Sequence, residues 1–142
     1  MTPYDPAEHG WHALTEWPLP GQFGTFWARR SDETWRYGVL TDASHANNNG
    51  VVHGGVLMTV ADHALSFLAW EAVERHACTT IQLNTHFLDA IHPGEFVEVR
   101  GEVSRRTRGL VFLRGEVLAH GGHAARPVGA VDGIWRVLRR SQ

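Results

Sequence analysis

The residues best suited to chemistry in this chain stand at the start of a predicted helix. Gly54 and Gly55 follow His53 and lead into an apolar segment, residues 56–72. Glycine lets a backbone come close to a ligand, and the first amides of a helix lack internal partners and lie at its positive dipole end. Such amides can stabilise a carbonyl oxygen that gains negative charge, so this pattern predicts a carbonyl-binding site.

Asp62 is the second candidate, because a carboxylate is costly in a helix that is otherwise apolar. Thr59, Asp62 and Ser66 are spaced three and four residues apart, so they form one narrow polar stripe. Asp62 could act in catalysis, or it could only bond a neighbouring backbone amide. It lies roughly 10–12 Å along the helix from the glycines. A two-fold dimer would let the partner's Asp62 approach this chain's glycines.

The element that must carry these residues is one long helix, because its apolar residues keep a spacing of three and four. They are Leu57, Val60, Ala61, Ala64, Leu65, Leu68 and Ala69. Val56, Met58 and Phe67 place apolar groups on other faces too, which predicts a buried helix.

Alternation of apolar and polar residues predicts strands around this helix. Their ranges are about 23–30, 35–42, 79–88, 95–104, 109–119 and 127–138. In the strand over 79–88, Ile81, Leu83 and Phe87 are expected on one face and Thr80 on the other. Short turns between the later strands favour an antiparallel sheet, hence an α+β fold with the sheet wrapped around one central helix. One sheet edge would stay open for a second copy of the chain.

The 142 residues have the size of one domain. Residues 1–22 contain four prolines and no steady period, so they are interpreted as an N-terminal extension that packs through its aromatic residues. Residues 23–142 are expected to form the single domain.

Composition argues against several functional classes. The net charge of −2 gives no reason to expect a nucleic-acid partner, and no apolar run is long enough to span a membrane. The N-terminus lacks the pattern of a secretory signal, and the single cysteine, Cys78, can form no internal disulfide, so a cytoplasmic protein is expected. Ten histidines occur, but without HExxH or CxxC spacing, and no metal is expected.

The segment 47–55, NNNGVVHGG, followed by an acidic residue in a buried helix, resembles the PaaI-like hotdog acyl-CoA thioesterases. In that family an asparagine stands six positions before the histidine of HGG, a glycine three before it, and an acidic residue nine after it. The matching positions are Asn47, Gly50, His53, Gly54, Gly55 and Asp62. Residues 79–88 and 92–95 are similar to the strand and turn after the helix. The resemblance covers about residues 24–140 and implies the hotdog fold.

The resemblance also implies an activity, the hydrolysis of an acyl-CoA thioester to a free acid and coenzyme A. The amide of Gly54, helped by Gly55, would polarise the thioester carbonyl. Asn47 would hold the attacking water or the carbonyl. Coenzyme A is then part of the substrate, and no separate cofactor is expected.

The remaining implied roles concern the water and the loop. Asp62 would be the general base or the nucleophile, and Thr80, eighteen residues later, would help to place the water. His53 would brace the loop rather than transfer protons. Two departures from the family concern the acyl pocket: Asn48 stands where a proline often follows the asparagine, and residues 88–93 lack the family's usual turn.

The substrate is expected to carry a medium-sized aryl or short-to-medium aliphatic acyl group, with Val60, Leu65 and Phe67 among the pocket walls. A basic turn contains Arg105, Arg106 and Arg108. These arginines either contact the phosphates of coenzyme A or form a solvated hairpin tip.

Two other functions stay open. A hotdog hydratase or dehydratase would use His53 and Asp62 as an acid–base pair, although the Asn47 and HGG spacing fits the thioesterases better. A non-catalytic acyl-CoA-binding dimer would leave Asp62 without a use. The expected assembly is a homo-oligomer, either a dimer or a tetramer formed by two dimers. The expected partner is a small-molecule acyl-CoA.

Overall fold

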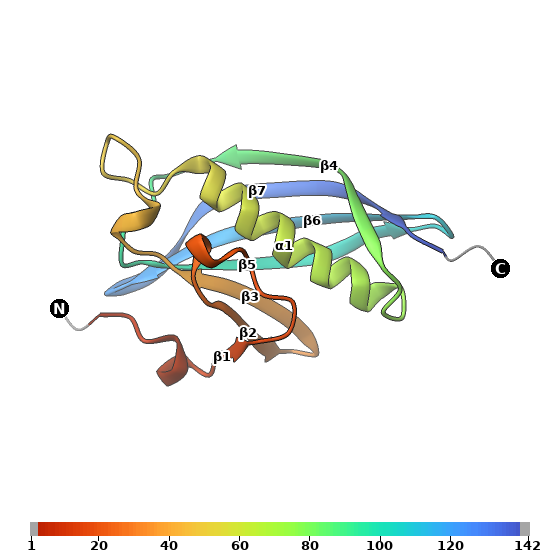
Figure 1. Ribbon diagram of the computed structural model, residues 1–142, viewed down its shortest axis with the longest axis horizontal. Helices are drawn as coiled ribbons and strands as arrows, with labels where there is room; N and C mark the ends of the chain where they lie inside the picture. The colour runs from red at the N-terminus through yellow and green to blue at the C-terminus, as the bar shows by residue number, and fades with distance from the viewer. Residues whose placement is uncertain (1–2, 140–142) are drawn as a thin grey trace.

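The computed structural model describes residues 3–139, which form one antiparallel sheet of seven strands with one α-helix across it (Figure 1). The strands are β1 (His12–Leu14), β2 (Phe26–Ser31), β3 (Thr34–Leu40), β4 (Cys78–Phe87), β5 (Phe96–Arg106), β6 (Leu110–Gly121) and β7 (His123–Val137). The helix is α1 (Gly54–Ala72), and three short 3₁₀ turns are η1 (Pro6–His9), η2 (Gly21–Phe23) and η3 (Ala43–His45). The predicted α+β class, a sheet around one long helix, is confirmed.

The sheet order is β1-β2-β3-β5-β6-β7-β4, so β4 crosses over to the far side of the sheet. Within the described part of the chain, β4 pairs only with β7 and leaves its other edge without a partner strand. The strand ranges expected from alternation agree with the structure to within a few residues. β1 was not predicted, because three residues are too few to show a period.

The helix packs through the seven residues that the spacing selected, all of which are buried. The sheet comes close to it at Gly101 on β5, where an added Cβ would lie 2.6 Å from Leu65 and 2.8 Å from Leu68. The predicted burial of α1 holds for this face, whereas Met58 on another face is 38% exposed. One sheet covers one side of a helix, and the other side stays open in a single chain.

A β-bulge in β4 changes which residues face the helix. The register against β7 shifts between Thr80 and Gln82, and one extra residue reverses the alternation of faces. Thr80 therefore lies on the helix side together with Leu83, which packs against the core, whereas Ile81 is 55% exposed. The prediction that placed Ile81 with Leu83, and Thr80 opposite, is wrong for this reason.

The segment before β2 passes from one face of the sheet to the other. On the face away from α1, the ring of Tyr4 stacks on His9 and Phe96, and Trp11 is buried against Phe96. After β1 the chain crosses to the helix side, where His63 donates a hydrogen bond of 2.8 Å to the carbonyl of Trp17. The extension thus contributes a strand and packs on both faces.

Glu98 on β5 is a fully buried carboxylate beneath this N-terminal segment. It accepts a hydrogen bond of 2.7 Å from His120 and another from Arg100, and Arg36 lies 3.6 Å away. Burial raises the pKa of Glu98, but the hydrogen bonds and charges of His120 and Arg100 outweigh burial and lower the pKa to about 2.

We expect Glu98→Gln to lower the free energy of unfolding at pH 7 by on the order of 3 kcal/mol, because Arg100 and Arg36 lose their buried counter-charge. A carboxyl with a depressed pKa stabilises the fold above its unfolded pKa, and this contribution fades as the pH falls toward about 2. Urea unfolding at several pH values should therefore show the difference shrinking below pH ~4.5. Glu116→Gln, an exposed carboxylate paired in register with Arg100, is the control. Equal losses in the two variants would contradict the account.

Candidate functional site

The first turn of α1 leaves one backbone amide available. His53 is the N-cap residue, and its Nδ1 accepts a hydrogen bond of 2.9 Å from the amide of Gly55. The amides of Val56 and Leu57 donate to the carbonyl of His53. Among residues 3–139 the amide of Gly54 meets no acceptor. Of the two glycines singled out from the sequence, Gly54 is thus the one whose N–H is free to polarise a carbonyl.

Asn47 holds the loop that precedes the helix. Its Oδ1 accepts hydrogen bonds from the amides of Asn49 at 2.9 Å and Val51 at 3.4 Å, and its own amide donates to the carbonyl of Val51. Gly50 closes this turn with φ +77, a conformation that favours glycine. Because Oδ1 is engaged in the loop, the side-chain NH₂ of Asn47 is the group left to donate to a ligand.

Asp62 and Thr80 form the polar centre of the exposed side of α1. The hydroxyl of Thr80 on β4 donates a hydrogen bond of 2.6 Å to Asp62 Oδ1. The other two members of the stripe are used within the chain: Thr59 donates to the carbonyl of Gly55, and Ser66 accepts from the indole of Trp135. Asp62 therefore bonds a hydroxyl rather than a backbone amide, and its second oxygen is available.

The two halves of the site lie apart within one chain. Gly54 and Asp62 are eight residues apart on the same helix, about 12 Å along its axis at about 1.5 Å per residue. The bulged strand β4, which carries Thr80, is also one of the two edge strands of the sheet in residues 3–139, β1 being the other (Figure 1). A reacting group bound at Gly54 is therefore out of reach of its own chain's Asp62.

A cavity of about 380 Å³ lies beside Gly54. Its walls are Val51, Val52, Leu57 and residues 87–91. The side chains expected to wall a pocket lie elsewhere: Val60 and Leu65 are in the core, and Phe67 stacks on Phe26 near β3. The three side chains therefore do not line this cavity.

Arg126 on β7 holds the far wall of this cavity, and sequence reasoning missed it. Its guanidinium donates to Asp89 Oδ2 at 3.0 Å, to the carbonyl of Ala90 at 2.6 Å and to Glu95. Hydrogen bonding to Glu95 raises the pKa of Arg126, and Arg126 in turn lowers the pKa of Glu95 against the effect of burial. The three partners are more than thirty residues away in sequence, so no local pattern could have identified the contact.

Arg105, Arg106 and Arg108 lie at the tip of the β5–β6 hairpin and are exposed. In Figure 1 this tip is near the C-terminal end of α1, whereas Gly54 is at the opposite end. The structure does not bring the three arginines to the glycines or to Asp62 within one chain.

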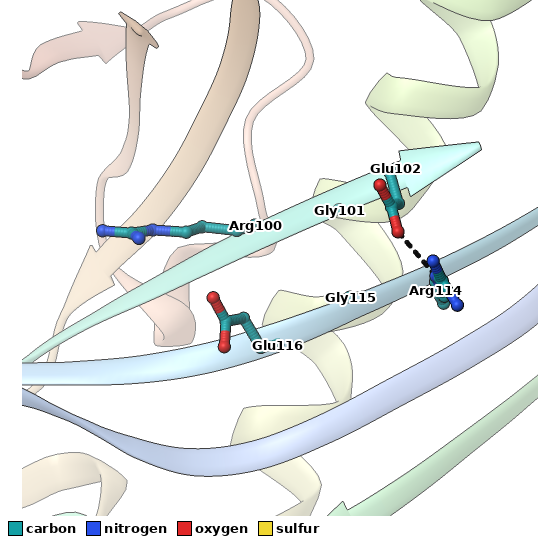
Figure 2. A pocket seen from close by; sticks show the side chains of 6 residues that line it. All are labelled: Arg100, Gly101, Glu102, Arg114, Gly115 and Glu116. Carbon is teal, nitrogen blue, oxygen red and sulfur yellow. Dashed lines mark hydrogen bonds and ion pairs between the residues drawn. The ribbon is translucent and has the colours of Figure 1, made fainter. Parts of the chain in front are cut away.

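A second hollow of about 380 Å³ lies on the sheet face away from α1 (Figure 2). Figure 2 shows Arg100 and Glu116 on one side of it and the Glu102–Arg114 ion pair, 2.6 Å, on the other, above two glycines. Charges of both signs balance there, and the sheet separates this hollow from Asp62 and Gly54.

Two structural features bear on other classes of site. In the stretch from residue 3 to residue 139, no helix is long and apolar enough to cross a membrane. In the same stretch, His, Cys, Asp and Glu side chains form no group of three that could hold a metal ion.

Comparison with known proteins gives the family. The Thioesterase superfamily matches residues 49–125, more than half of the chain, from the loop before α1 into β7. The Pseudomonas aeruginosa protein PA0474, which carries the name of an esterase, is 26% identical over 122 residues, 84% of this chain and 88% of that protein.

Solved structures show the same fold. A phenylacetic acid degradation-related protein of Ralstonia eutropha superposes with a TM-score of 0.72 at 23% identity, covering 87% of this chain and 94% of that one. The PaaI protein of Escherichia coli gives 0.66 at 16% identity, with 74% and 72% covered. Cj0915 of Campylobacter jejuni, described as a hexameric hotdog fold thioesterase, gives 0.68 at 18% identity, with 72% and 81% covered. With its sheet, its single helix and its HGG helix start, this chain belongs to the Thioesterase superfamily and has the hotdog fold of the PaaI-like proteins.

Proposed function

We propose that this protein hydrolyses an acyl-CoA thioester to a free acid and coenzyme A. The observation that carries the proposal is the unpaired amide of Gly54 at the start of a helix that also bears the Asp62–Thr80 pair. A hydrogen-bond donor for the carbonyl oxygen and a carboxylate base are the two groups that thioester hydrolysis needs. Membership of the Thioesterase superfamily supports the same reaction.

In the proposed reaction the thioester carbonyl accepts a hydrogen bond from Gly54 at the positive end of α1, which stabilises the oxyanion. The Asn47 NH₂ group donates to the same oxygen or to the water. Thr80 holds one oxygen of Asp62, so the other can take a proton from water as the water attacks the carbonyl carbon. The C–S bond then breaks, and the proton passes to the departing thiolate. Direct attack by Asp62 on the carbonyl is the variant of this chemistry that the geometry also allows.

The complete site requires two chains. A two-fold partner that pairs along the open edge of β4 would run its helix antiparallel to this one and present its own carboxylate to Gly54. Such a homodimer, alone or paired into a tetramer, is part of the proposal, and the hexameric relative from Campylobacter jejuni supports an oligomer.

The same two-fold arrangement would bring a partner's hairpin tip toward this chain's helix start. We therefore keep Arg105, Arg106 and Arg108 as the contacts for the phosphates of coenzyme A, since an exposed guanidinium can form paired hydrogen bonds with phosphate.

A cytoplasmic location belongs to this proposal as well, because the single thiol of Cys78 gives no sign of an oxidising compartment.

The alternatives have less support in the geometry. In a hydratase, His53 and Asp62 would act as an acid–base pair, but His53 Nδ1 is engaged with the Gly55 amide. A non-catalytic binding dimer needs no carboxylate at Asp62. Release of free thiol from a panel of acyl-CoAs distinguishes hydrolysis from both alternatives, because only hydrolysis produces it.

We expect Asp62→Asn to fold normally and to lose at least about 100-fold in kcat, because the substitution keeps the shape and removes the base. Thiol release should be measured next to circular dichroism and thermal unfolding. Asp132→Asn is the matched control, since Asp132 on β7 bonds a side chain on β4, Asn84, away from α1. A folded Asp62→Asn protein with near-normal activity would contradict the proposed mechanism.

His53 is expected to act as a helix cap. A residue that replaces it should therefore preserve stability only if its side chain can accept the hydrogen bond from the Gly55 amide. Asparagine is a good N-cap residue, and we expect His53→Asn to keep stability and activity within a few-fold, whereas His53→Ala should lose about 1 kcal/mol and activity with it. Unfolding and turnover measured on both variants test this. Equal, large losses of kcat without loss of stability would assign His53 to proton transfer instead.

Shared sites can be tested by mixing two inactive chains. Asn47→Ala and Asp62→Asn each damage both sites of a homodimer, but their mixed dimer has one site that combines an intact Asn47 with an intact Asp62. Once subunit exchange has been verified, mixed dimers should recover up to about half of the wild-type sites. Absence of recovery would show that Asn47 and Asp62 of one chain serve the same site.

A further inference from the structure

Phe87 is the side chain that comes closest to a Cβ added at Gly54, the residue with the free amide. It is the last residue of β4, and a Cβ added at Gly54 would lie 3.1 Å from two of its ring carbons. This distance is tighter than ordinary contact, so any side chain at position 54 would have to displace the ring. The ring of Phe87 therefore borders the point at which a carbonyl would bind.

Most of the other side chains around the cavity beside Gly54 are apolar. Val52, Leu57 and Ile91 form its buried floor, and Leu88 and Phe87 form its exposed rim, at 59% and 56% exposure. A volume of about 380 Å³ falls in the range of roughly 300–1,000 Å³ typical of ligand pockets.

The charges around the cavity decide which part of the substrate it suits. Asp89 at the rim is its charged lining residue and is paired with Arg126, so the lining offers no cation for the phosphates of coenzyme A. The two amides of the pantetheine arm would lose hydrogen bonds against apolar walls. An aliphatic or aryl acyl group loses nothing there and gains from burial.

Three sides of the cavity are fixed by hydrogen bonds. The amide of Val52 donates to the carbonyl of Ile91 at 2.8 Å, and the amide of Leu88 donates to the carbonyl of Val128 at 2.9 Å. Arg126 holds the chain at Asp89 and Ala90. These hydrogen bonds fix the position of the backbone around the cavity. The cavity volume therefore depends on the side chains that line it, and the largest of these is Phe87.

We propose that the acyl group occupies this cavity and that Phe87 is the residue that sets the size of the acyl group accepted. The inference rests on the proposed thioesterase function, and it names the substrate portion and the residue that selects it. Truncating the ring lengthens the pocket next to the reacting carbon, and enlarging the ring shortens it.

The test is a series of straight-chain acyl-CoAs of increasing length, assayed for kcat/KM with wild type, Phe87→Ala and Phe87→Trp. One methylene in an apolar pocket changes discrimination by roughly 10-fold or more. We expect the ratio of long-chain to short-chain kcat/KM to rise at least about 10-fold in Phe87→Ala and to fall in Phe87→Trp. Val103→Ala is the control, because Val103 is also an exposed apolar strand residue, 40% exposed, and lies outside this cavity. It should leave the ratio unchanged.

Equal losses at every chain length in both Phe87 variants would overturn the inference and assign Phe87 a structural role. Binding of non-hydrolysable S-alkyl-CoA thioethers, measured by calorimetry on the same variants, separates this failure from that of the function. If wild type releases no thiol, the thioesterase proposal fails, and a chain-length shift in thioether binding would still support the pocket. If wild type hydrolyses the series and neither ratio moves, only the role of Phe87 fails.

Discussion

A single sheet can bury only one side of a helix, and the arrangement of the site depends on this constraint. Seven residues of α1 fill the covered side, where Gly101 lets β5 come within contact of Leu65 and Leu68. Asp62 lies at the border of that side, where it accepts a hydrogen bond from Thr80 of β4. The outer edge of β4 has no partner strand among residues 3–139. The burial pattern that stabilises the fold thus also leaves open the side on which the proposed partner chain would bind.

Folding and chemistry make opposite demands on the start of α1. A helix start is most stable when all its free amides are capped, whereas a carbonyl site needs one amide uncapped. His53 resolves the conflict by accepting from Gly55 and not from Gly54. Two glycines weaken the helix by about 1 kcal/mol each relative to alanine, and the hydrogen bonds of Asn47 within the preceding loop restore order to the backbone.

The sequence predicted best those features that depend on neighbours along the chain. Helical spacing identified every buried position of α1, because one face of a helix is a local property. It failed at Ile81, since a bulge depends on the pairing of β4 with β7 and leaves no mark on the alternation of residues. It also failed to find Arg126, whose partners come from distant turns.

The contact between Phe87 and Gly54 shows why the helix start could be recognised from sequence while its surroundings could not. The HGG pattern follows from backbone needs at the site itself, so it is visible in three consecutive residues. Phe87 reaches Gly54 only because the bulge at Ile81 turns the second half of β4 toward the helix. Without that extra residue the alternation would point Phe87 away from α1. A shift of one residue in an edge strand therefore determines whether the proposed carbonyl site is bordered by this aromatic ring. Water excluded by the ring would strengthen a hydrogen bond from the Gly54 amide to a bound carbonyl.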